Sequence, residues 1–139
     1  MTKQLGKPPP RYCQRCDVRL SVKRKRMKFC YRCGVTARKE QSDRHHRARL
    51  AKTYGLLLDD YDAIYEYQRG KCAICQRATG ATKRLSVDHD HRIGAVRDAV
   101  RGLLCSKCNG MLGHARDDPA VFERAAAYLR SPPAREVLK

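Results

Sequence analysis

The sequence has no tryptophan, only two phenylalanines, and no long uninterrupted apolar segment in its 139 residues. A transmembrane helix needs roughly 20 consecutive apolar residues, so the sequence predicts no membrane span. The N-terminal segment is rich in lysine and proline and lacks the apolar core of a signal peptide. We therefore expect a soluble, cytoplasmic protein.

Large core-forming side chains are scarce, but cysteine is not. Eight cysteines form four Cys-x-x-Cys pairs, with none left over. In a cytoplasmic protein this pattern favours metal binding, and a disulfide framework is the weaker alternative because no export signal is present. Two structural Zn²⁺ sites with four thiolates each account for all eight cysteines. The first site would contain Cys13, Cys16, Cys30 and Cys33, and the second Cys72, Cys75, Cys105 and Cys108.

Acidic residues are rare in the first part of the chain. Residues 1–53 contain 17 Lys and Arg but only 3 Asp and Glu, whereas residues 54–139 contain 14 and 11. One strongly basic half favours a polyanionic partner, most simply DNA. The alternative is a basic surface that only keeps the protein soluble.

Composition and spacing divide the chain into five segments. We expect a flexible basic arm (1–11), a zinc module that is a ribbon or a treble-clef-like hairpin (12–35), a basic helix or linker (36–53), a second zinc-containing domain (54–131) and a C-terminal tail (132–139). The ribbon tip and the basic helix carry candidate phosphate contacts, since they are dense in cationic side chains. These are Arg24, Lys25, Arg26, Lys28, Arg44 and Arg47.

Within the second domain, the pattern predicts a helix over 60–69, with Asp59 as its N-cap and its tyrosines packed in the core. A strand should begin at 85–87, its partner should span 99–104, and a helix should follow Cys105. Asp117-Asp118-Pro119 should start a last helix. That helix should pack on the core through Phe122, Ala125, Ala126 and Leu129.

The run Asp88-His89-Asp90-His91 and the later Asn109 contain the side chains needed for phosphodiester hydrolysis. A neutral histidine can take a proton from water, and His89 is the expected base. Oxygen ligands can hold Mg²⁺ or Mn²⁺, and Asp88 and Asn109 provide them. Asp88 and His89 point to opposite faces of a regular strand, so the strand must end or bend there. We interpret Asp90 as a turn or supporting residue.

These motifs resemble a known nuclease family. Val-Asp-His-Asp-His followed by Arg-Gly-Leu-Leu-Cys-x-x-Cys-Asn is similar to the phage recombination endonuclease VII family, within the HNH or ββα-metal nucleases. The resemblance covers about residues 54–130. It implies that Asp88 and Asn109 bind catalytic Mg²⁺, that His89 is the general base, and that His91 contacts the scissile phosphate. It also implies homodimers that cleave branched DNA such as Holliday junctions during recombination, in the host cytoplasm if the protein is phage-encoded.

The predicted fold is a small α+β, zinc-stapled ββα-metal nuclease core with flanking helices and an N-terminal zinc ribbon of four cysteines. Arg101 is expected to bind phosphate. The predicted function is structure-selective cleavage of branched DNA. A nicking HNH endonuclease on duplex DNA and a non-catalytic zinc DNA-binding protein are the alternatives. One position differs from the family pattern, which has an acidic residue where this chain has Leu112.

Overall fold

The computed structural model describes residues 9–21, 26–94 and 96–138. The chain forms two compact units, Met1–Ala48 and Arg49–Lys139, which are described separately. Among the described residues, no helix is both long and apolar enough to cross a membrane. The candidate contacts Arg24 and Lys25 lie outside the described residues.

The first unit consists of a cysteine knuckle followed by helix α1 (Tyr31–Arg49). A short antiparallel bridge pairs Tyr12 with Arg19 around the first cysteine pair. The second pair does not form another hairpin, because Cys33 lies in the first turn of α1. Of the two forms that the spacing predicts, one knuckle followed by a helix start is closer to the treble-clef-like form than to the ribbon. The helix begins at Tyr31 rather than at residue 36, since the cysteine pair occupies its N-terminal turn.

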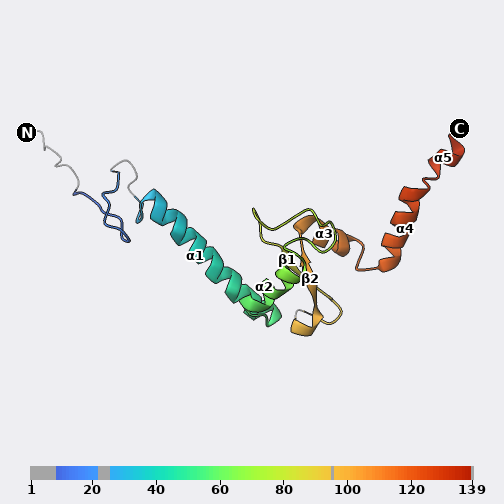
Figure 1. Ribbon diagram of the computed structural model, residues 1–139, viewed down its shortest axis with the longest axis horizontal. Coiled ribbons are helices and arrows are strands. Elements are labelled where there is room, and N and C mark those ends of the chain that lie inside the picture. The colour runs from blue at the N-terminus through green and yellow to red at the C-terminus, as the bar shows by residue number, and fades with distance from the viewer. Residues whose placement is uncertain (1–8, 22–25, 95, 139) are drawn as a thin grey trace, which may run out of the picture. The chain divides into compact units, whose positions relative to one another are not determined.

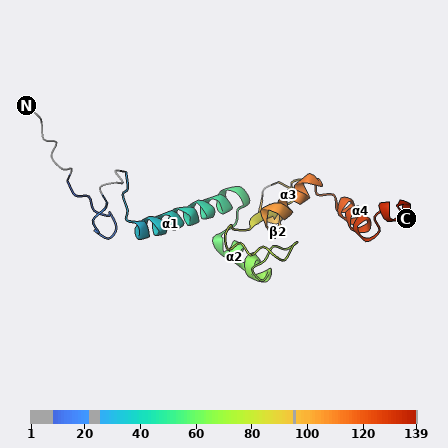
Figure 2. The same cartoon turned by 90° about the horizontal axis from the view of Figure 1, so that it is seen from above.

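The second unit is built on a two-stranded antiparallel sheet of β1 (Ser86–His89) and β2 (Val100–Leu104). Helices α2 (Leu58–Tyr67) and α3 (Ser106–His114) contact this sheet (Figure 1; Figure 2 shows the same helices from above). A π-helical turn, η1 (Leu50–Tyr54), precedes them, and a 3-10 turn, η2 (Arg97–Ala99), leads into β2. Strand, strand and helix follow in the predicted ββα order.

The core of this unit is small and lies between the sheet, α2 and the second cysteine group. Leu103 is fully buried, and Leu50, Leu56 and Leu85 are almost so. Tyr61 is buried in the same cluster, and its hydroxyl donates to the Leu85 carbonyl at 2.9 Å. The predicted packing in the core is confirmed for Tyr61. Its hydroxyl has the acceptor that a buried phenol needs.

A β-bulge interrupts the sheet between Asp88 and His89. Asp88 pairs with Gly102 but His89 pairs with Val100, so Arg101 is the extra residue on β2. A bulge bends its strand and re-aims nearby side chains. The bulged strand is β2, and β1 itself ends at His89, so the pairing becomes irregular at the step where the sequence requires β1 to end or bend.

Helix ends follow the predicted chemistry in one case and not in another. Asp118 accepts from the Ala120 N–H at 2.9 Å and caps α4 (Pro119–Arg130), as predicted. For α2, however, the N-cap is Leu57, whose N–H donates to Asp60 at 2.8 Å, so the predicted cap at Asp59 is wrong. The carboxylate that reaches the cap N–H lies three positions after it, as in a capping box.

Helix α4 differs from the prediction in its packing. None of its residues is buried, and Leu129 is 74 % exposed. The predicted packing of Phe122, Ala125, Ala126 and Leu129 on the core is therefore wrong, because the described chain offers no apolar surface that buries them. A short helix, α5 (Ala134–Val137), follows in the segment predicted to be a tail.

Candidate active site and metal centres

Both cysteine groups have the geometry of four-thiolate zinc sites. In each group the sulfur atoms all lie within 4.8 Å of one another. Cys16 and Cys30 are 3.7 Å apart and Cys75 and Cys105 4.0 Å apart, Sγ to Sγ. Tetrahedral zinc with Zn–S bonds of about 2.3 Å places its sulfurs roughly 3.8 Å apart, whereas a disulfide needs about 2.05 Å. The two groups predicted from spacing are therefore assembled, and they suit structural zinc.

The two knuckles share one local design. Residues Asp17 and Gln76, which directly follow Cys16 and Cys75, both have left-handed backbone (φ 53° and 55°). Their N–H groups donate to the carbonyls of Cys13 and Cys72 at 3.0 and 3.1 Å. At the second knuckle, backbone hydrogen bonds from Ala78 and then Arg77 lower the pKa of Cys75 to about 6. The turn of the second knuckle thus aims N–H groups at the Cys75 sulfur and favours its thiolate, the form that binds metal.

Asp88 is the centre of a separate polar cluster. It is the single buried charged or polar residue within the described ranges, at 6 % exposure. The Arg101 guanidinium donates to both carboxylate oxygens of Asp88, with Nε–Oδ2 at 2.7 Å and Nη2–Oδ1 at 2.9 Å. A buried carboxylate is costly unless it is paired, and this bidentate contact supplies the pairing.

Asp117, which follows α3, joins this cluster of Asp88 on β1 and Arg101 on β2. One oxygen accepts from Arg101 Nη2 at 3.0 Å, and the other lies 3.2 Å from His91 Nδ1. The hydrogen bond from Arg101, and then that from His91, lower the pKa of the Asp117 carboxyl. Arg116 and Asp117 both have left-handed φ values (54° and 55°), and the Asp117 N–H donates to the Leu112 carbonyl at 3.0 Å. The end of α3 therefore holds this carboxylate against the β-hairpin.

The two histidines lie side by side on the other part of the cluster. The His89 and His91 ring centroids are 4.5 Å apart, and the Tyr54 and His89 centroids are 5.4 Å apart in an edge-to-face arrangement. Tyr54 is buried at the end of η1, so a rigid aromatic side chain limits the rotation of His89. Asp90 bonds the backbone N–H and the guanidinium of Arg92, and Arg92 lowers its pKa. Asp90 is thus a turn residue, as interpreted from the sequence.

Asn109 is half-buried in α3, the helix that contacts both strands. Its N–H donates to the Cys105 carbonyl at 2.9 Å, so the second cysteine group fixes the turn that carries it. Leu112, one turn later, packs against the core cluster. A carboxylate at this position would have to enter an apolar contact, which explains physically why leucine suits it here.

Comparison with known proteins identifies the family. The family model described as recombination endonuclease VII matches residues 47–131, more than half of the chain. The chain belongs to the recombination endonuclease VII family. It is 55 % identical over 91 residues to the Gene 59 protein of Mycobacterium phage D29, covering 65 % of this chain and 53 % of that protein. It is 51 % identical over 102 residues to the Gene 59 protein of Mycobacterium phage L5, covering 73 % and 60 %.

The endonuclease VII match has clear limits. The chain spans little more than half the length of these two relatives. No solved structure matches it. The matched range contains Asp88, His89, Asn109 and the second cysteine group, whereas the first cysteine group lies before it. The family model therefore covers most of the second unit, and almost all of the first unit lies before the matched range.

Sequence reasoning missed two contacts of this endonuclease VII unit. It interpreted Arg101 as a phosphate ligand, but the guanidinium forms ion pairs with Asp88 and Asp117. It interpreted Asp117 only as a helix-start residue. No periodicity signals this contact, since Asp117 lies 26 residues from His91 and 16 from Arg101. The remaining described candidates for DNA contact, Arg26, Lys28, Arg44 and Arg47, are all exposed.

Asp88 and Asn109, the two residues predicted to bind a catalytic cation, differ in what they already contact. Asp88 offers carboxylate oxygens and Asn109 an amide oxygen, the ligand types that Mg²⁺ prefers. Leu112 offers none. A cation at Asp88 would compete with Arg101, and Asp117 already accepts a second hydrogen bond from the same guanidinium. If Asp88 bound a cation, Arg101 would therefore still have Asp117 as a hydrogen-bond partner.

Proposed function

We propose that this protein is a metal-dependent DNA endonuclease of the HNH type that hydrolyses phosphodiester bonds in branched DNA. The observation that supports it most is the register shift at the end of β1, where the buried Asp88 is followed by the half-buried His89. Helix α3, which carries Asn109, contacts both strands. Membership of the recombination endonuclease VII family supports the same function.

In the proposed reaction, His89 takes a proton from water as the water oxygen bonds to phosphorus. The bond between phosphorus and the leaving sugar oxygen then breaks, and that oxygen is protonated from solvent. Bound Mg²⁺ or Mn²⁺, held by Asp88 and Asn109, would neutralise charge on the phosphate and the leaving oxygen. Tyr54 restricts the His89 ring, and His91 lies beside it to contact the scissile phosphate.

The two zinc groups have a structural role in this proposal. Four thiolates close the coordination sphere of zinc, so neither site has a free position for water or substrate. The second group joins the segment before β1 to the start of α3, and so positions Asn109. Two structural Zn²⁺ ions and one catalytic cation are the cofactors that we infer.

The preferred substrate in this proposal is branched DNA, such as a four-way junction. Nicking of ordinary duplex and binding without cleavage are the other outcomes of the test. A homodimer, as the family resemblance implies, would allow two strands of a junction to be cut, one by each subunit.

The test compares the full-length protein with its His89→Ala variant, with Mg²⁺, on a four-way junction and on linear duplex of the same sequence. We expect junction cleavage that falls at least about 100-fold in the variant, the contribution of a general base. Equal cleavage of linear duplex would support a nicking enzyme. No cleavage by the wild-type protein with Mg²⁺ or Mn²⁺ would refute the enzymatic proposal.

A further inference from the structure

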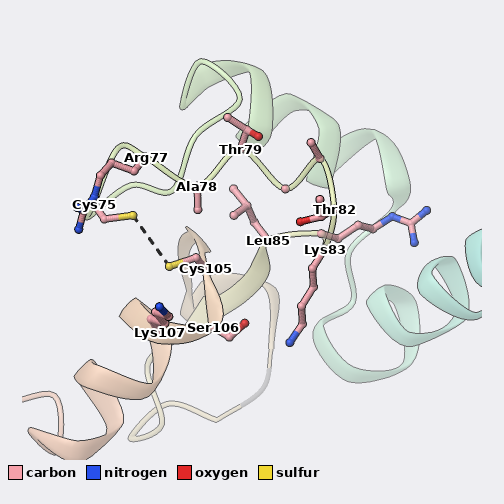
Figure 3. A pocket seen from close by; sticks show the side chains of 13 residues that line it. Cys75, Arg77, Ala78, Thr79, Thr82, Lys83, Leu85, Cys105, Ser106 and Lys107 are labelled. Carbon is pink, nitrogen blue, oxygen red and sulfur yellow. Dashed lines mark hydrogen bonds between the residues drawn. The ribbon is translucent and has the colours of Figure 1, made fainter.

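A hollow beside the second cysteine group has no role in the proposed chemistry. It lies between the loop after the first knuckle and the beginning of α3, and its volume is about 620 Å³. Figure 3 shows Thr79 and Leu85 on one side of it and Ser106 and Lys107 on another, with Cys75 and Cys105 at one end. None of these lining residues belongs to the cluster around Asp88.

The lining is cationic and rich in hydrogen-bond donors. Four basic residues contribute to it, together with three hydroxyl side chains, and none of the 13 lining residues is acidic. The basic residues are Arg77, Lys83, Arg84 and Lys107, and the hydroxyl residues are Thr79, Thr82 and Ser106. Hydroxyls and cations together suit phosphate oxygens.

Carboxylates of the described residues leave most of this charge unbalanced. Within the described residues no ion pair is recorded for Arg77, Lys83 or Lys107, whereas most aspartates of the second unit are matched with an arginine. Those pairs are Asp60–Arg97, Asp88–Arg101, Asp90–Arg92, Asp117–Arg101 and Asp118–Arg124. Zinc with four thiolates carries two negative charges, so about half of the positive charge of the hollow remains.

The start of α3 adds backbone donors to the hollow. Ser106 and Lys107 are the first two residues of this nine-residue helix, and both line the hollow. The Cys108 N–H donates to Cys105 Sγ at 3.5 Å, so the N–H groups of Ser106 and Lys107 are the ones that can favour an anion. Cations, hydroxyls and helix N–H groups therefore converge on one space.

The hollow and the proposed reactive residues involve different faces of α3. Lys107 lines the hollow and Asn109 belongs to the proposed reactive set, and residues two apart on a helix do not share a face. One DNA segment that follows the reactive face would leave the hollow unfilled. Two separate phosphate sites on one unit suit a substrate with two DNA segments.

We propose that this hollow binds the phosphate backbone of a second DNA segment, adjacent to the one being cut. The inference rests on the proposed function and deepens it, because the hollow would give the protein its preference for branched over linear DNA. Lys83 and Lys107 are the principal contacts, and Ser106 with the α3 N–H groups completes the site.

Binding to DNA tests this inference without relying on cleavage. In the full-length His89→Ala background, Lys83→Gln, Lys107→Gln and the double variant are compared with Lys71→Gln. Lys71 is the matched control. Like Lys107, it is an exposed lysine directly before a cysteine of the second group, but it does not line the hollow. Affinity for a four-way junction and for a short duplex is measured by fluorescence anisotropy over a salt series.

We expect the double variant to lose about 10-fold or more in junction affinity at low salt, and its salt slope to fall by about 1.8 for two phosphate contacts. Duplex affinity should change much less, and Lys71→Gln should match the parent. Equal losses on both DNAs, or a double variant that behaves as Lys71→Gln does, would overturn the inference. The inference would also be overturned if sodium pyrophosphate bound the hollow while the salt slope of junction binding stayed unaltered in the double variant.

Two controls keep the result interpretable. Zinc content is measured for each variant, and Lys83→Gln alone decides if Lys107→Gln loses zinc, because Lys83 is not adjacent to a cysteine. Cleavage by the wild-type protein is measured separately. If the wild-type protein cuts junctions but its lysine variants bind DNA normally, only the proposed role of the hollow is overturned. If the wild-type protein cuts no DNA, the proposed endonuclease activity is refuted.

Discussion

Asp117 joins side chains from two distant parts of the chain. Its carboxylate contacts Arg101 on β2 and His91 in the loop after β1, and its backbone is held in the left-handed region at the end of α3. Non-glycine residues with this backbone cost about 1–3 kcal/mol each, and two occur in succession here. In the proposed reaction we expect Asp117 to position Arg101 and His91, because its carboxylate contacts both.

Asp117→Asn should therefore lower kcat by about 10- to 100-fold, the range for residues that orient reactive groups, with little change in KM. Asparagine tolerates the left-handed conformation, so the fold should be kept. Asp118→Asn is the control, because it removes the same charge one residue later and asparagine caps a helix as well as aspartate does.

The measurement is steady-state cleavage of the DNA that the wild-type protein cuts, together with the NMR signals of the His91 ring. The ring signals should change in Asp117→Asn and not in Asp118→Asn. Unaltered kcat and unaltered ring signals in Asp117→Asn would show that the carboxylate has no positioning role.

The bulged hairpin is the element on which the reactive cluster depends. Gly102 lies directly opposite Asp88 with φ at 154°, and a Cβ placed there would be 3.0 Å from Gln68 Oε1. Gln68 cannot easily move away, because its side chain accepts from the Leu103 N–H at 2.8 Å and donates to the Leu103 carbonyl at 2.9 Å. One glutamine therefore secures β2 next to the bulge.

Gly102→Ala should destabilise the protein by about 1–3 kcal/mol through backbone strain, in addition to the crowding at Gln68. Gly110→Ala is the matched control, since it lies within α3 and a Cβ there meets nothing within 4 Å. The control should be neutral or more stable by about 0.5–1 kcal/mol. Denaturant unfolding checks both, and equal stability of the two variants would contradict this account of the bulge.

At the scale of the whole molecule, the first unit adds positive charge to an endonuclease VII unit. The family match begins at residue 47, so the first cysteine group and most of α1 precede it. Arg26, Lys28, Arg44 and Arg47 are exposed, and no ion pair is recorded for them within the described residues. We expect them to contact phosphates irrespective of DNA sequence.

Replacing these four residues by glutamine in the full-length chain should weaken DNA binding and reduce its salt slope by up to about 3.6, at roughly 0.9 per contact. Unlike the lysines of the hollow, they should affect duplex and junction equally. Anisotropy over a salt series checks this, and an unaltered slope would show that the first unit has another role.

Much of this architecture is encoded locally. Paired cysteines specified both metal groups, because a Cys-x-x-Cys turn brings two sulfurs within reach of one ion whatever surrounds it. The Asp118-Pro119 helix start and the ββα order likewise depend on neighbouring residues. An end or bend of the strand between Asp88 and His89 was predicted from strand alternation, because the proposed reaction needs both side chains at one phosphate.

The tertiary structure decided what depends on distant partners. Arg101 pairs with Asp88 because of a one-residue bulge, and Asp117 reaches His91 from the end of another element, contacts that no local pattern encodes. The exposure of Leu129 was equally unpredictable, since an amphipathic helix shows which face is apolar but not whether the chain covers it. Spacing thus determines ligands within one turn, whereas ion pairs and burial depend on how the turns are brought together.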